Sequence, residues 1–270
     1  AHVIAGLYDL GDRPLAVICQ DDLAAKRLQG ELKAFLGQEP PVLPGRDLNL
    51  YDAAVVSRVW EQRRLRQLYD LGKGQTRLQI FSWESMSLRT MPKSALFAAA
   101  FQLRLGVQVS VEELLARLVA MGYSRAPMVE GPGQFALRGG ILDLFSPAEG
   151  QPVRVEFFGD ELDTMGYFDP NTQRRTENVE EITVLPVAES QPGLHPGGIP
   201  GLQRDLQALL ARQKRRKNQN ERLIRTLEQD LERLENGVSL PAPDRYMALI
   251  APEMTTALDY VPQDALVVVC

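Results

Sequence analysis

The sequence predicts an α/β protein in which a larger, doubly wound α/β domain carries an inserted small α+β domain and a helical arm. Three observations lead to this prediction. Apolar strand-like runs alternate with amphipathic helical segments toward both ends of the chain, which is typical of a parallel sheet covered by helices. Short alternating strands separated by turn residues fill the middle, which is typical of an antiparallel sheet. A leucine-rich helical segment follows those strands.

Length and composition are those of a folded protein. The 270 residues correspond to about two domains, and 44% hydrophobic with 24% charged residues exclude wholesale disorder. The formal net charge of −5 argues against a chain held on DNA by its overall charge, but it allows a local basic patch. No apolar run approaches the ~20 residues of a membrane helix, and no secretory signal opens the sequence. We therefore expect a cytoplasmic protein without a membrane partner.

The strand and helix signals of the larger domain come in a regular order. The uniformly apolar run Leu15–Cys19 is typical of a strand buried on both faces. Asp21 is positioned to cap the amphipathic helix that follows, and another strand is expected at residues 78–83. The apolar run 266–270 predicts a further buried strand, and both ends of the sequence read as cut from a longer polypeptide. The expected boundaries are 1–106 with 250–270 for this domain, 107–190 for the small α+β domain, and 191–249 for a linker and helical domain.

The small domain is predicted to be one helix followed by an antiparallel sheet. Ser110 and Glu113 have the spacing of a capping box, which begins a helix. Gly139-Gly140 is expected to form a tight turn between two strands. In the strand 153–158 every second side chain shares a face. This alternation places on the polar side of the sheet Arg138 from one strand and Arg154, Glu156 and Phe158 from another.

An aromatic ring beside an arginine on the polar side of the sheet has two interpretations. In the simpler one, Phe158 caps a second small apolar cluster and Arg154 pairs with Glu156, a surface ion pair worth about 0–1 kcal/mol. In the functional one the two residues form a protein-binding hot spot, because arginine and aromatic side chains dominate interface energetics. Periodicity alone leaves both interpretations open.

A helical arm is predicted after a linker rich in proline and glycine. Leucines spaced three and four residues apart run through 202–234 with a polar gap between two sets, which indicates either a helical hairpin or one bent helix. The gap contains the basic run Lys214, Arg215, Arg216 and Lys217. Its functional interpretation is a face that contacts nucleic-acid phosphates. The simpler interpretation is a solvated helix flank, since no aromatic residue lies in the run to stack on bases.

The sequence contains no recognisable catalytic motif. Neither histidine, His2 nor His195, has a carboxylate or nucleophile at motif spacing. Cys19 and Cys270 lie in apolar runs, which excludes a disulfide scaffold and a cysteine metal cluster. Gly72-Lys73-Gly74 is the nearest fragment to a P-loop, but it lacks the upstream glycine and the hydroxyl after lysine. We therefore expect no catalytic, metal-binding or cofactor-binding residue in this chain.

Two blocks of the small domain, residues 135–145 and 153–163, resemble a known family. The match continues through Phe168-Asp169, Gln173-Arg174 and Leu185-Pro186, and more weakly at 258–262. In these segments the sequence is similar to the UvrB-homology module of nucleotide-excision DNA repair. That module occurs in UvrB and in the N-terminal region of the transcription-repair coupling factors. The resemblance covers 107–190 strongly and the whole chain loosely.

The coupling factors are the closer of these two families. The stretch between Asp47 and Val107 is short and contains no Tyr-rich hairpin, unlike UvrB, whose hairpin inserts at damaged DNA. The resemblance implies a larger domain of degenerate nucleotide-binding type and a small domain that recruits UvrA in transcription-coupled repair. The matching positions for UvrA binding are Arg138, Arg154 and Phe158, the same residues that strand alternation places on the polar side.

The resemblance also implies that this chain is a non-catalytic interaction module. ATP as a cofactor, and RNA polymerase and DNA as partners, are implied only for parts of the full-length protein that this chain does not contain. Two other functions stay open. One is a fragment of UvrB itself, a damage-verifying helicase-like ATPase. The other is an unrelated α/β protein whose basic arm binds nucleic acid.

Overall fold

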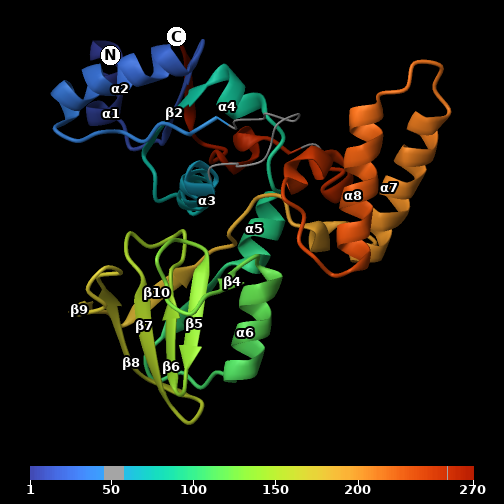
Figure 1. Cartoon of the computed structure of the whole chain (residues 1–270). Helices are drawn as coiled ribbons and strands as arrows, with labels where there is room; N and C mark the ends of the chain where they lie inside the picture. The colour runs from blue at the N-terminus through green and yellow to red at the C-terminus, as the bar shows by residue number, and fades with distance from the viewer. Residues whose placement is uncertain (46–57, 254) are drawn as a thin grey trace. The chain divides into compact units, whose positions relative to one another are not determined.

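The computed structural model of the chain describes residues 1–45, 58–253 and 255–270. Its mixture of helices, a parallel sheet and an antiparallel sheet confirms the predicted α/β class (Figure 1). By contacts the described chain divides into a larger unit, residues 1–45, 58–189 and 255–270, and a smaller unit, residues 190–253. The division into three parts with the boundaries expected from the sequence stays a prediction.

A three-stranded parallel sheet in the order β11-β1-β2 lies in the larger unit. Strands β1 (Leu15–Cys19) and β2 (Leu78–Ser82) are buried along their whole length, which explains their apolar sequences. Helix α1 (His2–Leu10) and helix α2 (Asp22–Leu36) contribute to the same core cluster as these strands. Asp21 caps α2 as predicted, because its side chain accepts a hydrogen bond from the Ala24 N–H at 2.7 Å.

Strand β11 (Leu266–Val269) differs from the buried strand that the sequence indicates. Its residues alternate between half-buried and exposed, and Val269 is 76% exposed. Among the described residues β11 pairs with β1 alone. An apolar run therefore lies at the edge of the described sheet.

The small domain contains helix α6 and a six-stranded sheet. Ser110 caps α6 (Val111–Ala120) by accepting a hydrogen bond from the Glu113 N–H at 3.4 Å. The strands pair in chain order, and all neighbours from β5 onward are antiparallel. They are β4 (Ser124–Arg125), β5 (Gln134–Arg138), β6 (Ile141–Leu144), β7 (Val153–Phe158), β8 (Glu161–Phe168) and β9 (Arg175–Asn178).

One face of this sheet packs on the core of the small domain. Strand β3 (Phe101–Arg104) pairs antiparallel with β10 (Glu181–Val184), and both contribute buried residues to the core together with α6. The sheet contributes its alternate side chains to this cluster: Phe135, Leu142, Leu144, Val153, Val155, Leu162 and Met165. The side chains on the opposite face of the sheet therefore point away from this core.

A buried ion pair ties helix α3 (Arg58–Gly72) to the chain that leaves the small domain. The Arg64 Nε lies 2.9 Å from the Glu189 Oε1, and both side chains are buried. The Thr90 hydroxyl also donates to Glu189, while Arg64 donates to the Ser85 carbonyl at 2.9 Å. Because a buried charge is costly without a partner, this network stabilises one arrangement of these segments. Nearby lie α4 (Trp83–Ser87), α5 (Lys93–Ala99) and η3 (Ala257–Tyr260).

The smaller unit is built on a helical hairpin, which decides between the two arm structures left open by the sequence. Helix α7 (Gly198–Lys214) and helix α8 (Glu221–Glu235) pack through a cluster of leucines. Asn220 caps α8 by accepting a hydrogen bond from the Leu223 N–H at 3.0 Å. Three short helices complete the unit: η1 (Pro192–Leu194), η2 (Pro243–Tyr246) and α9 (Met247–Ile250).

In the part of the chain that the structure describes, no helix combines the length and the apolar character needed to cross a membrane.

Candidate functional site

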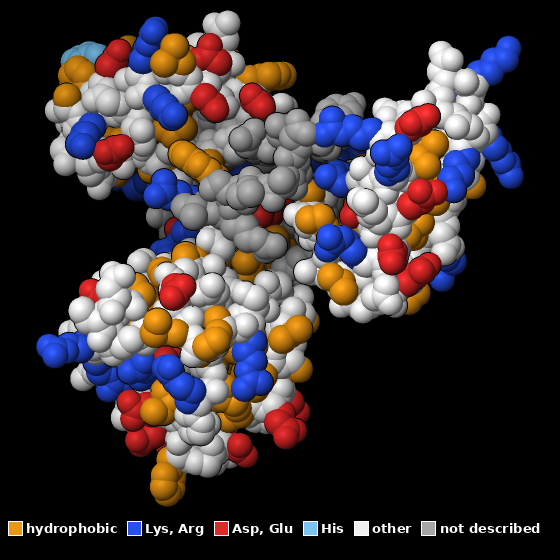
Figure 2. All heavy atoms as spheres, viewed as in Figure 1, with side chains coloured by type: hydrophobic (Ala, Val, Ile, Leu, Met, Phe, Trp, Pro, Cys, Tyr) orange, Lys and Arg blue, Asp and Glu red, His pale blue; other side chains and the backbone are white. Residues whose placement is uncertain are grey.

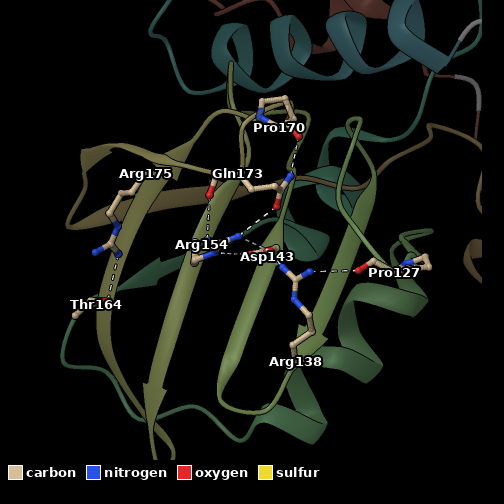
Figure 3. A network of polar contacts seen from close by, with 8 residues as sticks. All are labelled: Pro127, Arg138, Asp143, Arg154, Thr164, Pro170, Gln173 and Arg175. Atoms are coloured by element: carbon tan, nitrogen blue, oxygen red, sulfur yellow. Dashed lines mark hydrogen bonds and ion pairs between the residues drawn. The ribbon is translucent and has the colours of Figure 1, made fainter.

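The face of the six-stranded sheet that points away from the core is called here the outer face. Strand register places Asp143 beside Arg154, and Arg154 beside Gly166, on neighbouring strands. Alternation along β5 and β7 puts Arg138 and Glu156 on the same face. Figure 3 shows the side chains of Arg138 and Arg154 converging on Asp143. Of the polar-face positions expected from the sequence, Arg138 and Arg154 are thus brought together through Asp143.

Asp143 is the centre of the outer face. Its side chain is fully buried, and it accepts hydrogen bonds from Arg154 Nε at 2.7 Å and Nη2 at 2.9 Å. Arg138 Nη2 also donates to the same carboxylate. The hydrogen bond to Asp143 is the main reason that the pKa of Arg154 is raised above its ordinary value. One buried carboxylate therefore fixes two guanidinium groups.

The simpler interpretation of Arg154 is wrong about its partner. The structure pairs Arg154 with Asp143 on the neighbouring strand, not with Glu156 on its own strand. An ion pair between neighbouring strands brings the two charges closer than residues i and i+2 of one strand, whose side chains stand about 7 Å apart. The Arg154 side chain is only 21% exposed as a result.

A second apolar cluster lies on the outer face, as the simpler interpretation expected, but Phe158 takes no part in it. The cluster consists of Val129, Ala136 and Phe168, with Phe145 packed against it. The Arg154 guanidinium lies 4.7 Å from the centre of the Phe168 ring. Phe168 thus occupies the place that the sequence-based interpretation gave to Phe158.

Phe158 projects into solvent from the C-terminal end of strand β7. It is the last residue of β7 and is 81% exposed. The two-residue turn that follows contains Gly159 at φ +63°, a conformation that favours glycine. Arg138 likewise ends β5, ahead of the Gly139-Gly140 turn. Since β5 and β7 run in the same direction, their C-terminal ends lie on the same side of the sheet, where the strands turn.

Two further residues of the outer face were missed by sequence reasoning. Arg175 donates from Nη2 to the Thr164 hydroxyl at 3.2 Å and lies over Gly166, where a Cβ would be 2.5 Å from its Nε (Figure 3). Ile141 pairs with Arg138 and Glu156 and is partly exposed. Strand β9 has only four residues, too few for alternation to reveal its faces. A signal for Arg175 was Gly166 on the neighbouring strand, whose missing side chain leaves room for the Arg175 guanidinium.

The loop before β9 holds Arg154 from a second side. Gln173 has a positive φ of +59°, and its backbone and side-chain oxygens each accept a hydrogen bond from Arg154 at 3.3 Å. Arg138 donates more weakly to the Pro127 carbonyl at 3.4 Å. Arg154 is therefore fixed from both sides, whereas the Arg138 side chain is 50% exposed.

The outer face combines features of a protein-binding surface. It presents three arginines, Arg138, Arg154 and Arg175, together with the carboxylates Asp143 and Glu156, and the strand register places Glu161 opposite Phe158. Arginine and aromatic residues flanked by aliphatic ones are typical of the centre of protein interfaces. Among the described residues, no group of three or more His, Cys, Asp or Glu side chains could hold a metal ion.

The basic run belongs to the smaller unit, at the turn of the helical hairpin. Lys214 ends α7, and Arg215, Arg216 and Lys217 lie in the connection to α8. All four residues are exposed, and Lys214 Nζ lies 2.6 Å from Glu228 Oε1 across the hairpin.

Comparison with known proteins assigns the small domain to a family. The family model described as "UvrB interaction domain" matches residues 101–189. Arg138, Arg154, Phe158 and Arg175 all fall within that range.

Curated relatives extend the similarity beyond the small domain. A transcription-repair-coupling factor of Myxococcus xanthus is 34% identical over 197 residues, 70% of this chain and 16% of the relative. That of Staphylococcus aureus strain USA300 is 31% identical over 188 residues, 69% of this chain and 16% of the relative. That of Bacillus subtilis strain 168 is 26% identical over 260 residues, 95% of this chain and 22% of the relative. The chain thus spans less than a quarter of the length of these relatives.

Proposed function

This chain is a UvrB-homology module of the transcription-repair-coupling factor family, and from that premise we propose that it serves transcription-coupled DNA repair by recruiting UvrA. The outer face of the six-stranded sheet is the surface proposed to bind UvrA. The observation that carries the proposal is Phe158, a large aromatic side chain 81% exposed to solvent at the end of the strand that also carries Arg154, inside the segment that the UvrB interaction domain matches. Exposure of such a ring to water is unfavourable, whereas its burial in an apolar pocket of a partner is favourable.

The residues of the outer face have different roles in this proposal. Phe158 is the anchor that enters an apolar pocket on UvrA, with Ile141 beside it. Arg138, half exposed, offers free N–H groups to a carboxylate at the rim of that pocket. Arg154 has most of its N–H groups bound by Asp143 and Gln173, so it acts mainly by fixing Asp143 and, through it, Arg138.

The charge of the outer face specifies the partner surface it fits. The one fully buried carboxylate is already engaged by two guanidinium groups, and the Arg138 side chain is still 50% exposed, so Arg138 can donate to a further carboxylate on a partner. An apolar pocket rimmed by Asp or Glu side chains complements this arrangement. We therefore propose that the UvrA surface has this character.

The module is proposed to act by binding alone. The polar groups at the centre of the outer face bind one another, since Arg138 and Arg154 both donate hydrogen bonds to Asp143. Contacts with RNA polymerase, the use of ATP and the main contacts with DNA are proposed for the remaining length of the full protein, because this chain spans at most 22% of the relatives named above.

Calorimetric titration of purified UvrA into the chain tests the proposal. We expect one binding site, and we expect Arg154→Ala to weaken binding by about 2 kcal/mol or more, the scale of interface hot spots. Arg138→Ala is expected to weaken it by about 1–2 kcal/mol without disturbing the fold, since its side chain is half exposed. Arg27→Ala, an exposed arginine on α2, is the matched control. Wild-type affinity in both folded outer-face variants, or no binding by the parent chain, would contradict the proposal.

A further inference from the structure

We propose that the turn of the α7–α8 hairpin, residues 212–225, is a contact surface for the phosphate backbone of duplex DNA. This segment is called here the hairpin tip. It contains seven Lys and Arg residues and a single Glu, in a chain whose formal net charge is −5. The inference concerns the smaller unit and is independent of the proposed UvrA surface.

The fold gathers these charges at one end of the hairpin. The end of α7, the connecting loop and the start of α8 meet there (Figure 1), and Figure 2 shows Lys and Arg side chains projecting at that end. Each of the basic residues is exposed. They are Arg212, Lys214, Arg215, Arg216, Lys217, Arg222 and Arg225.

The ion pairs of Lys214 and Arg225 neutralise little of this charge. Lys214 pairs with Glu228 at 2.6 Å, and Arg225 lies 3.9 Å from Glu221. Both pairs are exposed to solvent, and such pairs are worth at most about 1 kcal/mol. A solvated helix flank normally interleaves the two signs at spacings of three or four. Residues 212–217 contain five cations and no anion. This composition favours a binding surface for an anionic partner over a solvated helix flank.

The remainder of α8 carries the opposite charge. Beyond residue 225 the helix contains Glu228, Asp230, Glu232 and Glu235 against Arg233. The hairpin is therefore polarised, basic at the tip and acidic toward its other end. A partner that approaches the tip along the axis of the hairpin therefore meets mainly positive charge.

The chemistry of the tip favours a phosphate backbone over a protein partner. Protein interfaces need an apolar, well-packed centre, and the large apolar side chains that are exposed in the described chain include none between residues 200 and 237. The tip also contains no aromatic residue, so it offers nothing on which unpaired bases would stack. Exposed Lys and Arg groups without either feature are typical of contacts to the phosphates of a duplex.

The start of α8 adds to the same field. Unpaired backbone N–H groups at a helix N-terminus carry partial positive charge, and Asn220 satisfies the Leu223 N–H there. The remaining groups of the first turn lie beside Arg222 and the connecting loop. These N–H groups add a small positive charge to the much larger charge of the Lys and Arg side chains.

Fluorescence anisotropy with a labelled DNA duplex of about 25 base pairs tests the inference on the intact chain. The tip variant combines Arg215→Ala, Arg216→Ala and Lys217→Ala, and it keeps Lys214, which pairs with α8. The matched control combines Lys26→Ala, Arg27→Ala and Lys33→Ala on α2, which removes the same amount of charge from exposed positions. Titrations are run between about 50 and 200 mM salt, because each phosphate contact contributes about 0.9 to the slope of log affinity against log salt.

We expect the parent chain and the α2 control to bind the duplex with the same salt dependence. The tip variant should bind at least about tenfold more weakly at low salt, with a slope smaller by about 2–3, while its affinity for UvrA stays unchanged. Absence of DNA binding by the parent chain, or equal loss in both variants, would overturn the inference. Tighter binding of polyglutamate than of the duplex would also overturn it and assign the tip to an acidic protein.

Discussion

Asp143 is the residue on which the geometry of the outer face depends. It is fully buried and receives hydrogen bonds from Arg138 and Arg154. Its charge is compensated twice, whereas the two arginines have no other carboxylate within ion-pair distance among the described residues. Removal of this one charge therefore leaves two cations close together and only partly solvated.

We expect Asp143→Asn to lower the free energy of unfolding by about 2–4 kcal/mol, because breaking a buried ion pair from one side leaves a charge without its partner. Urea unfolding followed by circular dichroism measures the change. Asp163→Asn, an exposed carboxylate on β8, is the control and should change stability by less than about 0.5 kcal/mol. Equal stability of the two variants would show that Asp143 does not hold the arginines.

At the residue scale the sequence predicted the face but not the partners. Strand alternation alone places Arg138 and Arg154 on one side of the sheet, because the side-chain period of a strand is two. The pairing of both with Asp143 depends on the register between β5, β6 and β7, which follows from the turns and the packing of the whole domain. Arg175 was missed because it reaches this face from β9, a short exposed strand.

At the scale of elements, four tyrosine hydroxyls join segments that are distant in the sequence. Tyr123 donates to the Leu185 carbonyl at 2.7 Å, and Tyr167 donates to Glu149 at 2.6 Å. Tyr246 donates to Asp230 and Tyr260 to the Met91 carbonyl. Burial is the largest cause of a raised pKa in all four, and burial together with the hydrogen bond to Glu149 raises the pKa of Tyr167 to about 12.

These tyrosines predict a loss of stability in alkali. The ordinary pKa of tyrosine is about 10, and the fold favours the protonated form, so the stabilisation is complete below pH ~10 and is lost as pH rises through the folded-state values. For Tyr167 this window is about pH 10–12. Urea unfolding at a series of pH values should show a falling free energy of unfolding above pH ~10.

A conservative substitution isolates one of these hydroxyls. Tyr167→Phe should make the fall in the free energy of unfolding between pH ~10 and ~12 less steep. Tyr8→Phe is the matched control and should leave the steepness of that fall as it is in the parent chain. A free energy of unfolding that stays constant to pH ~12 in the parent chain would be inconsistent with the raised pKa values.

Elements were predicted well where local signals are strong. The strand Leu15–Cys19, the Asp21 cap and the Ser110 cap are confirmed, because uniform burial and capping leave direct marks on the sequence. The edge position of β11 was not evident, since an apolar run does not show how many neighbours its strand has. The hairpin form of the arm was left open because helical periodicity continues on both sides of the polar gap.

At the scale of the whole molecule, the outer face of the sheet and the hairpin tip both present basic side chains, although the chain is acidic overall. The outer face of the sheet belongs to the larger unit, and the hairpin tip belongs to the smaller unit. The first combines arginines with exposed apolar side chains, and the second has cations alone. Different partners are therefore expected for them, a protein pocket for the outer face and a phosphate backbone for the tip.

The measurement that tests the central claim most directly is the affinity of UvrA for Phe158→Ala. Phe158 is 81% exposed, so its removal leaves the fold intact and reports on binding alone. Val119→Ala, which removes an apolar side chain 59% exposed on α6, is the control in the same domain. We expect Phe158→Ala to cost about 2 kcal/mol or more of binding free energy, roughly 30-fold in affinity, and the control to bind as the parent does. Equal affinities of the two variants would contradict the assignment of the outer face to UvrA.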